Sequence, residues 1–467
     1  MVFSLSTVLA VAKKHCFYDE TVTYPPASDI VDEIVKQTAG NENAEQLATW
    51  PLLRKKTLYT TIERLVNDES PDNTYRQSSY ISITGGGRGS LPLFFATDVR
   101  ENRRQRAEFG KLIASTGMLG GRDWVLSMHS AGGLYRALDL TLEYVEEAGA
   151  CTLAAGHVMP VPAVLQLLVK YKVNVLAGDS SQVIDVVNHL SALPREEQDK
   201  IRLDKILYTS EVLTGSQRAH IRATLGQKIK ICSALASAET GPWAFSNPDL
   251  TGDRTTTSSD FVYDTRTMAV EIFPHSAAEE DAGGMAVTAP QPLADGETGL
   301  IVLTSLCRLR NPLVRYISGD VGSLHDLPEA VRHLVKEADR PHIRVLRLEG
   351  RDRRFSFDWE GEYIEFANLA GIVEDPRYGI LQWQAIIENR PHEQEGLRPC
   401  LEVRMLPSTT TRSDDALLGE MVGRIKTLIA ATSSNADRFT PVFLENADGF
   451  EKSKTGGKVI KFIDRVS

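Results

Sequence analysis

The sequence predicts an α/β protein with a large N-terminal domain of stacked α/β sheets plus a β region, residues 1–349, and a small α+β C-terminal domain, residues 350–467. Three observations support this fold class. A chain of 467 residues is too long for one ordinary hydrophobic core. Helical and strand patterns alternate over about residues 124–237, which is typical of βαβ units on a parallel sheet. Beyond Phe245, short strand patterns separated by Gly and Asp turns predict an antiparallel β region.

The first 75 residues read as mainly helical, with a loop at Tyr24-Pro25-Pro26. The apolar run Phe3–Ala12 is followed by Lys13 and Lys14, whereas a signal peptide carries its positive charges before the apolar run. We therefore expect an amphipathic first helix. The segment "SSYISI" then predicts a strand that runs into a glycine-rich loop.

The alternating region contains five predicted strands of a parallel sheet and the helices between them. A strand in "DWVLS" precedes a helix over about Arg136–Glu147, and a further strand follows that helix. A helix in "PAVLQLLVKYK" precedes the buried strand "VNVLAG" and another helix. The strands "KILYTSE" and "KIKICSALASAE" flank a helix around Gln217–Thr224. Ligands of such folds bind at the carboxyl ends of the strands, so we expect the functional residues there.

The residues beyond Phe245 are expected to form a β region and then the small domain. "GETGLIVLTSL" is a strand of the β region, and the domain boundary is expected near Gly350. Beyond it, strands are expected near "QWQAIIE" and "CLEVRML", a helix around Leu417–Ala431, and a final strand near "PVFLEN". The mixture of strands and one long helix indicates an α+β unit.

Composition excludes several classes of function. The net charge is −10 and no Lys/Arg-rich block occurs, so neither nucleic acid nor an anionic membrane is an expected partner. The five cysteines are scattered without a CxxC pair, which indicates a reducing, cytoplasmic location and neither a disulfide framework nor a Cys-rich zinc site. No apolar stretch reaches the roughly 20 residues of a transmembrane helix, so no membrane span is expected.

The glycine-rich stretch "SITGGGRGSLP" suggests a loop that approaches phosphate closely. It is not a Walker A loop, because that motif needs Lys and then Ser or Thr after its second glycine, and Gly89 is followed by Ser90-Leu91. It is not a dinucleotide fingerprint either, because the third glycine would fall on Ser90. Alone, the stretch is equally compatible with a glycine-rich turn.

Four charged residues follow in motifs of their own. Glu239 lies just after a predicted buried strand in "SALASAETGP", and Asp320 sits in the Gly-flanked turn "RYISGDVG". Arg351 belongs to "LEGRDRR", and Lys458 follows two glycines in "KSKTGGKVIKF". Each residue taken singly has an ordinary explanation as a turn residue or a surface charge. Their order and spacing carry the functional information.

In this order and spacing the motifs resemble the adenylate-forming superfamily, which includes acyl-CoA synthetases, nonribosomal-peptide adenylation domains and luciferases. The segment "TSEVLTGSQRAHIRATLG" and the N-terminal helix resemble the phenylacetate-CoA ligase branch most closely. The resemblance covers the chain from about residue 8 to the end. It implies a small C-terminal domain that is mobile, activation of a carboxylic acid as acyl-AMP with loss of pyrophosphate from ATP, and transfer of the acyl group to CoA.

The resemblance also implies roles for individual residues. Lys458 would bridge the substrate carboxylate and the α-phosphate, Glu239 would bind Mg²⁺, and Arg351 would contact ribose or phosphate. These three form the expected catalytic set, and Asp320 would bind the ribose hydroxyls. The expected ATP-binding residues are Thr84, Gly85, Gly86, Gly87, Arg88, Gly89, Ser90, Ser210, Ala236, Ser237, Asp320 and Arg351.

The acid pocket is expected between the "MHSAGGLY" loop, the "AGDSS" loop and the "SALAS" strand. Small residues predominate there, which leaves room for an aromatic ring or a branched acid. The expected pocket residues are His129, Gly132, Gly133, Tyr135, Gly178, Asp179, Ser180 and Ala234. His129 is interpreted as a wall or satisfied core histidine rather than a catalytic base.

Several positions depart from the superfamily pattern and keep alternatives open. Ser90 stands where the loop usually has Lys, and Leu235 where a ring normally packs on adenine. The hinge motif has Arg353 at its usual Asp position, with Asp352 one residue earlier, which puts the CoA step in question. One alternative is therefore an amide ligase that transfers the acyl group to an amine. The other is a degenerate member that binds nucleotide without turnover.

Overall fold

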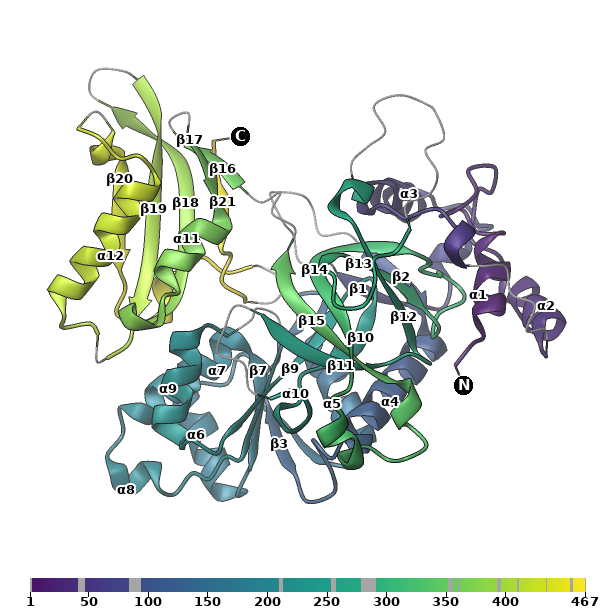
Figure 1. Cartoon of the computed structure of the whole chain (residues 1–467), viewed down its shortest axis with the longest axis horizontal. Coiled ribbons are helices and arrows are strands. Elements are labelled where there is room, and N and C mark those ends of the chain that lie inside the picture. The colour runs from purple at the N-terminus through teal and green to yellow at the C-terminus, as the bar shows by residue number, and fades with distance from the viewer. Residues whose placement is uncertain are drawn as a thin grey trace.

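A single mixed sheet organises the N-terminal three quarters of the chain (Figure 1). The computed structural model describes residues 2–40, 47–83, 94–209, 213–252, 258–278, 291–351, 356–359, 362–392, 396–409, 411–433, 435–453 and 457–466. Within these residues the sheet has eleven strands in the order β12-β13-β14-β15-β11-β10-β9-β8-β7-β3-β6. The mixed α/β fold class predicted from the sequence is confirmed.

The parallel half of this sheet consists of the strands predicted from the alternating pattern. β3 pairs in parallel with β6 and β7, β7 with β8, and β8 with β9. The strands are β3 (Trp124–Ser127), β6 (Cys151–Ala154), β7 (Val175–Asp179), β8 (Lys205–Thr209) and β9 (Lys230–Ser237). The intervening helices are α5 (Ala137–Glu147), α6 (Val161–Lys170), α7 (Ser180–Ser191), α8 (Arg195–Gln198) and α9 (Gly215–Leu225).

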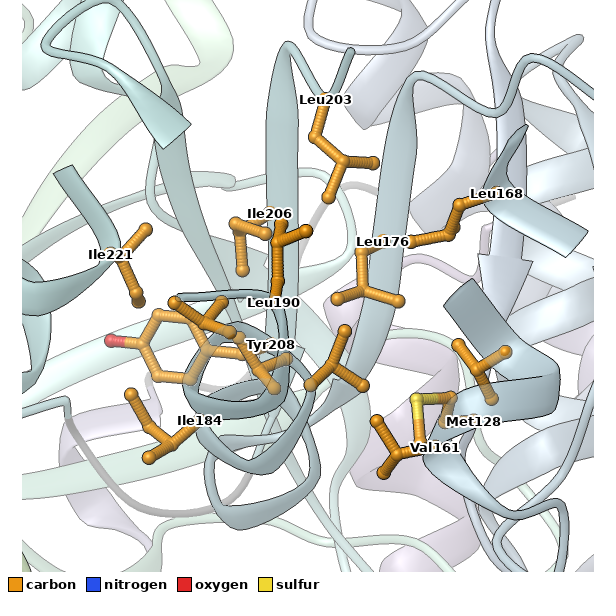
Figure 2. Close-up of a cluster of buried hydrophobic side chains, with 14 of the residues drawn as sticks. Met128, Val161, Leu168, Leu176, Ile184, Leu190, Leu203, Ile206, Tyr208 and Ile221 are labelled. Atoms are coloured by element: carbon orange, nitrogen blue, oxygen red, sulfur yellow. The ribbon is translucent and has the colours of Figure 1, made fainter. Parts of the chain in front are cut away.

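Neighbouring side chains along the parallel strands point to opposite faces of the sheet, and helices cover both of these faces in the parallel half. Leu176 and Ile206 point into one buried cluster with α6, α7 and α9, and Figure 2 shows them gathered with Ile184 and Leu190 of α7. Their neighbour Val175 faces the opposite cluster with α5 and with α4 (Val99–Ser115). Successive side chains of a strand point to opposite faces, so a strand buried on both sides is apolar throughout.

The antiparallel half continues the same sheet without a break. β10 (Gly241–Phe245) pairs antiparallel with β9, and β11 (Ser259–Asp264) pairs with β10, so the change of direction comes before Phe245. The short helix α10 (Pro248–Thr251) lies between them in sequence. The remaining strands are β12 (Met268–Phe273), β13 (Gly299–Ser305), β14 (Tyr316–Asp326) and β15 (Ile343–Arg351).

The N-terminal helices and two small hairpins complete this part. The expected helices are α1 (Leu5–Ala12), α2 (Ser28–Thr38) and α3 (Lys55–Asn67). Thr7, Val8 and Leu9 of α1 are buried, and Ser4 caps its first turn. The hairpins are formed by β1 (Ser79–Ile83) with β2 (Phe94–Asp98), and by β4 (Ala131–Gly132) with β5 (Tyr135–Arg136). Among the described residues, no helix has the length and apolar character needed to cross a bilayer.

The C-terminal part forms its own four-stranded sheet in the order β20-β19-β18-β21. Its strands are β18 (Ile380–His392), β19 (Gly396–Pro407), β20 (Phe439–Phe443) and β21 (Phe462–Asp464), with the hairpin β16 (Ser356–Trp359) and β17 (Glu362–Glu365) and the helices α11 (Phe366–Val373) and α12 (Asp415–Leu428). The prediction that the last strand lies near "PVFLEN" is wrong, because β21 follows β20. Three residues are too few for a recognisable strand pattern.

The C-terminal sheet packs on the large sheet's helices. Leu381, Leu406, Phe450 and Val459 belong to the same buried cluster as α6, α7 and α9. In Figure 1 this part, in yellow-green, lies next to α7 and α9. The domain boundary expected near Gly350 falls within the last residues of β15, a strand of the large sheet, and the division into two domains stays a prediction.

Candidate active site

Asp320 and Arg351 lie opposite each other on neighbouring strands. β14 and β15 pair antiparallel, and Asp320 is the register partner of Arg351. The expected turn at Asp320 is wrong, because the residue lies inside β14, where the register with β13 shifts between Leu300 and Val302. Ser318 Oγ holds this irregularity: it accepts from the Asp320 amide at 3.1 Å and donates to the Ile301 carbonyl at 3.0 Å. Gly319 has φ +83°, a conformation that favours glycine. Two motifs that are distant in sequence thus meet at one sheet position.

Glu239 lies in the turn between β9 and β10, and its side chain is held by two tyrosines. The residue is only 5% exposed. The hydroxyls of Tyr59, from α3, and Tyr316, from β14, both donate to Oε1, the latter at 3.2 Å. Burial and the Glu239 carboxylate raise the pKa of Tyr316 well above its ordinary value, so the Tyr316 hydroxyl keeps its proton and remains a donor. The arrangement holds the carboxylate in one orientation.

Two further side chains hold the backbone of this turn. Arg308 donates to the Glu239 carbonyl, and Gln105 Nε2 donates to the Thr240 carbonyl at 2.6 Å. Burial lowers the pKa of Arg308 to about 10, so the guanidinium stays charged at neutral pH. Gly241 has φ +67°, and a Cβ there would lie 2.7 Å from Arg308 Nη2. The side chains of Arg308 and Gln105 can therefore approach the turn this closely only because residue 241 is a glycine.

The donor set around Glu239 suits a magnesium ion bound together with a nucleotide. Among the described residues, no group of three or more His, Cys, Asp or Glu side chains could hold a metal. Mg²⁺ is usually bound through one or two carboxylates plus substrate phosphates rather than by an all-protein cage. The Glu239 carboxylate, held in one orientation, could supply the single protein ligand of such a magnesium–phosphate site.

Lys458 lies on a hairpin loop of the C-terminal part and faces Tyr135 of β5. Lys452 and Val459 form an antiparallel bridge, and the Ser453 amide donates to the Lys458 carbonyl at 2.7 Å. Lys458 Nζ lies 5.3 Å from the centroid of the Tyr135 ring, within cation–π distance. The expected catalytic lysine and an expected pocket residue, far apart in sequence, are thus adjacent.

His129 lies just beyond the carboxyl end of β3 and is buried, with 1% exposure. Its Nδ1 is 3.0 Å from Ser127 Oγ and its Nε2 is 3.0 Å from Thr209 Oγ1, at the end of β8. Burial, with a smaller contribution from the positive charge of Lys458, lowers the pKa of His129 to about 3. The imidazole is therefore neutral and engaged by hydroxyls at both nitrogens.

The neutral state of His129 predicts a pH dependence of stability. Its folded pKa of about 3 lies below the ordinary value of 6.5, so between these pH values only the unfolded chain takes up the proton. The stabilisation is complete above pH 6.5 and is lost as the pH falls. From pH 7 to pH 5 we expect wild type to lose about 2 kcal/mol more unfolding free energy than His129→Asn in urea melts. Equal losses in the two proteins would show that the folded protein protonates His129.

The hairpin that carries Tyr135 is open to solvent at its tip. Gly132, Gly133 and Leu134 have φ values of +85°, +56° and +68°, and Leu134 is 65% exposed. The two glycines allow this tight reversal, because left-handed backbone costs them little. The expected pocket residues Gly132 and Gly133 thus lie beside Tyr135 on the side of the sheet where the parallel strands end.

The expected "AGDSS" loop is wrong. Gly178 and Asp179 are the last residues of β7, and Ser180 begins α7 directly. Asp179 is the N-cap of that helix: its carboxylate accepts from the Gln182 amide at 2.9 Å, and the Gln182 side chain accepts from the Asp179 amide. This is a capping box, and its Asp-x-x-Gln spacing was visible in the sequence. Asp179 therefore caps the start of α7, and its place in the acid pocket stays a prediction.

The other expected residues divide into three groups. Ala236 and Ser237 are exposed at the end of β9, where Ser237 Oγ accepts from the Thr240 amide at 3.0 Å. Ala234 is buried in the core cluster between the sheet and α4. The following lie outside the described residues: Thr84, Gly85, Gly86, Gly87, Arg88, Gly89, Ser90 and Ser210. The glycine-rich segment joins β1 to β2 where Ile83 and Phe94 are register partners.

Tyr59 and Tyr316 are site residues that the sequence interpretation missed. Tyr316 immediately precedes the "ISGD" segment, so its place in a motif was a usable signal. Tyr59 lies in an amphipathic helix with no motif around it, and only the packing of α3 against β14 brings its hydroxyl to Glu239. A contact of this kind depends on tertiary packing and leaves no local pattern.

Comparison of the fold with solved structures finds matches, whereas comparison of the sequence does not. No protein-family model and no curated protein matches it. The structure of 2-hydroxyisobutyryl-CoA ligase in the post-adenylation state, in complex with R3-HIB-AMP, matches with a TM-score of 0.64 at 16% identity, covering 98% of this chain and 87% of the ligase. In the thioesterification state, with 2-HIB-AMP and CoA, the same ligase matches with a TM-score of 0.55 at 16% identity, over 98% of this chain and 87% of the ligase.

The likeness establishes the fold. An open conformation of the same ligase, also 16% identical, matches with a TM-score of 0.53 over 98% of this chain and 89% of the ligase. The TM-score is thus higher with the post-adenylation form than with the other two forms. The chain therefore shares its fold with this CoA ligase, and the fold expected from the resemblance is confirmed.

Proposed function

We propose that this protein is an ATP-dependent carboxylic acid ligase that forms an acyl adenylate and passes the acyl group to CoA as a thioester. The observation that carries the proposal is that Lys458 Nζ lies 5.3 Å from the centroid of the Tyr135 ring, so the expected catalytic residue is next to an expected residue of the acid pocket. The fold supports the same reading, since the matched ligase was crystallised with an acyl-AMP and, in another state, with CoA as well.

Adenylation requires that several negative charges be held together and that the charge developing in the transition state be stabilised. In our proposal Lys458 supplies a compact positive charge between the acid and the α-phosphate. Asp320 accepts hydrogen bonds from the ribose hydroxyls, and Arg351, its register partner, contacts ribose or phosphate. The Thr84–Ser90 backbone and Arg88 bind the terminal phosphates.

Different residues carry the proposals for magnesium and for the acid. Glu239 is the proposed Mg²⁺ ligand, and a bound Mg²⁺ would supply Lewis-acid neutralisation of the phosphate charge. The two tyrosine hydroxyls and Arg308 keep the carboxylate and its turn in place for this role. We propose an aromatic or otherwise non-fatty acid as substrate, as in the phenylacetate-CoA ligase branch, because glycines form the hairpin beside Tyr135.

Acid-dependent exchange of labelled pyrophosphate into ATP, measured with a panel of aromatic, branched and hydroxy acids, tests the first step. We expect exchange with at least one acid, because reversal of adenylation returns pyrophosphate to ATP. A matched reaction without acid controls for contaminating activity. If no acid supports exchange in the intact protein, the enzyme reading is wrong and the nucleotide-binding alternative replaces it.

The acceptor is decided by a second assay with the acid that supports exchange. We expect a CoA thioester when CoA is supplied, and no amide when a panel of amines replaces it. The shifted hinge residues Asp352 and Arg353 keep the amide ligase as the second candidate. Amide formation without any thioester would establish that candidate and leave the adenylation step intact.

A further inference from the structure

Gln384 of β18 is a buried polar side chain for which the site described so far gives no role. It is 0% exposed. Its Nε2 donates to the Glu451 carbonyl at 2.9 Å and to the Ile460 carbonyl at 2.7 Å, and its Oε1 accepts from the Glu451 amide at 3.1 Å. Both amide protons and the oxygen are therefore used, as a buried amide requires.

The two residues that Gln384 binds are the two arms of the hairpin that carries Lys458. The Ile460 amide also donates to the Glu451 carbonyl at 3.0 Å, so the arms meet at the level of the Gln384 amide. Lys458 lies two residues before Ile460, and the hairpin is otherwise closed by the Lys452–Val459 bridge. One side chain of the C-terminal sheet thus closes the base of this hairpin.

The same face of β18 also contacts the large sheet's helices. Gln382, two residues earlier and therefore on the same face of the strand, donates to Ser181 Oγ of α7 at 3.0 Å. Its Oε1 accepts from Lys461 Nζ at 2.7 Å, next to the hairpin. Val459 packs in the buried cluster that α7 helps to form. Side chains of β18 therefore bind the hairpin on one side, and Val459 packs it against the N-terminal part of the chain, which carries Tyr135 and His129.

We propose that Gln384 is a positioning residue for adenylation, which acts by fixing the backbone from which Lys458 extends. The proposal rests on the proposed role of Lys458. A lysine is a point charge on a flexible four-carbon stem, so its placement depends on the backbone beneath it. A displacement of about 1 Å in a catalytic group can cost roughly a hundredfold in rate. Without the amide, the hairpin base loses three hydrogen bonds.

Two variants of the full chain test the role by pyrophosphate exchange. Gln384→Met keeps the size and removes all three hydrogen bonds, and Gln384→Glu keeps the shape but loses both donors. For each we expect the exchange rate at saturating ATP to fall about 10- to 100-fold. The KM for ATP should stay within about twofold, because interactions lost only in the transition state lower kcat. In the Lys458→Ala background the same change should have no further effect, since residues that act as a unit are not additive.

A control variant separates positioning from general loosening of the C-terminal sheet. Val403 is 0% exposed in the C-terminal core and is the register partner of Ala385, next to Gln384. Val403→Ala should lower stability but leave the exchange rate near that of wild type at temperatures where both are folded. If Val403→Ala lowers the rate as much as Gln384→Met, or if both Gln384 variants match wild type, the positioning role is overturned.

Hydrogen exchange gives a readout that does not depend on activity. In Gln384→Met we expect the amides of Glu451 and Ile460 to exchange faster than in wild type, with the strands β18 and β19 unchanged. If wild type itself supports no pyrophosphate exchange with any acid, the proposed function is wrong, and the hydrogen-exchange result alone decides whether Gln384 holds the hairpin. Unchanged exchange at both amides overturns the inference.

Discussion

Lys458→Ala is expected to remove nearly all adenylation activity, leaving a residual rate about 10²–10³-fold below that of wild type, while the fold stays intact. The ammonium is the mobile positive charge proposed to lie between the acid and the α-phosphate, and it sits 5.3 Å from the Tyr135 ring centroid. Removing one electrostatic group aimed at transition-state charge typically costs about 10²–10³ in rate. The measurement is acid-dependent pyrophosphate exchange, with circular dichroism to verify folding. Lys458→Arg should restore little, because a planar guanidinium does not replace a compact ammonium.

The control for this variant lies on the same hairpin. Lys452→Ala removes an exposed lysine whose backbone bridges to Val459, and it should leave the exchange rate close to that of wild type. Both variants remove one positive charge from the hairpin, so a difference between their exchange rates shows that the position of the Lys458 charge matters and not only the total charge. Unchanged exchange in Lys458→Ala would move the catalytic role to another residue.

Asp320→Ala is expected to raise the KM for ATP about ten- to a hundredfold, because hydrogen bonds to a charged group are worth about 1.5–3 kcal/mol. The carboxylate is proposed to accept from both ribose hydroxyls, at the sheet position opposite Arg351. The effect should fall on KM for ATP rather than on KM for the acid. It is measured by pyrophosphate exchange over a range of ATP concentrations.

The analogue 2′-deoxy-ATP, which lacks one ribose hydroxyl, distinguishes a loss of ribose binding in Asp320→Ala from a general loss of structure. Wild type should discriminate against 2′-deoxy-ATP, and Asp320→Ala should treat ATP and 2′-deoxy-ATP alike. Asp326→Asn is the matched control, since Asp326 is an exposed carboxylate at the far end of the same strand β14. An Asp320→Ala protein that still prefers ATP over the deoxy analogue would remove Asp320 from the ribose site.

The candidate site was only partly predictable from sequence. The motifs named Glu239, Asp320, Arg351 and Lys458, and the register of β14 and β15 brings two of them together. Gln384 was missed because glutamines that alternate with apolar residues in "QWQAIIE" resemble the solvent face of a strand, whereas this face is covered by the Lys458 hairpin.

The wrong prediction of an "AGDSS" loop has a local cause rather than a tertiary one. The "AGDSS" segment was expected to form a loop between the buried strand "VNVLAG" and the helix that follows it. The Asp-x-x-Gln spacing instead closes a capping box with Gln182 at the first turn of α7. Attention to this spacing would have placed the start of the helix at Ser180, directly after the strand.

By itself the sequence determined the order and type of most elements, because hydrophobic periodicity and helix caps act over a few neighbouring residues. Only the tertiary structure decided which distant residues meet. Tyr59 reaches Glu239 through the packing of α3, and Lys458 reaches Tyr135 because the C-terminal sheet rests on α7 and α9. Such meetings depend on how whole elements pack, and no local pattern records them.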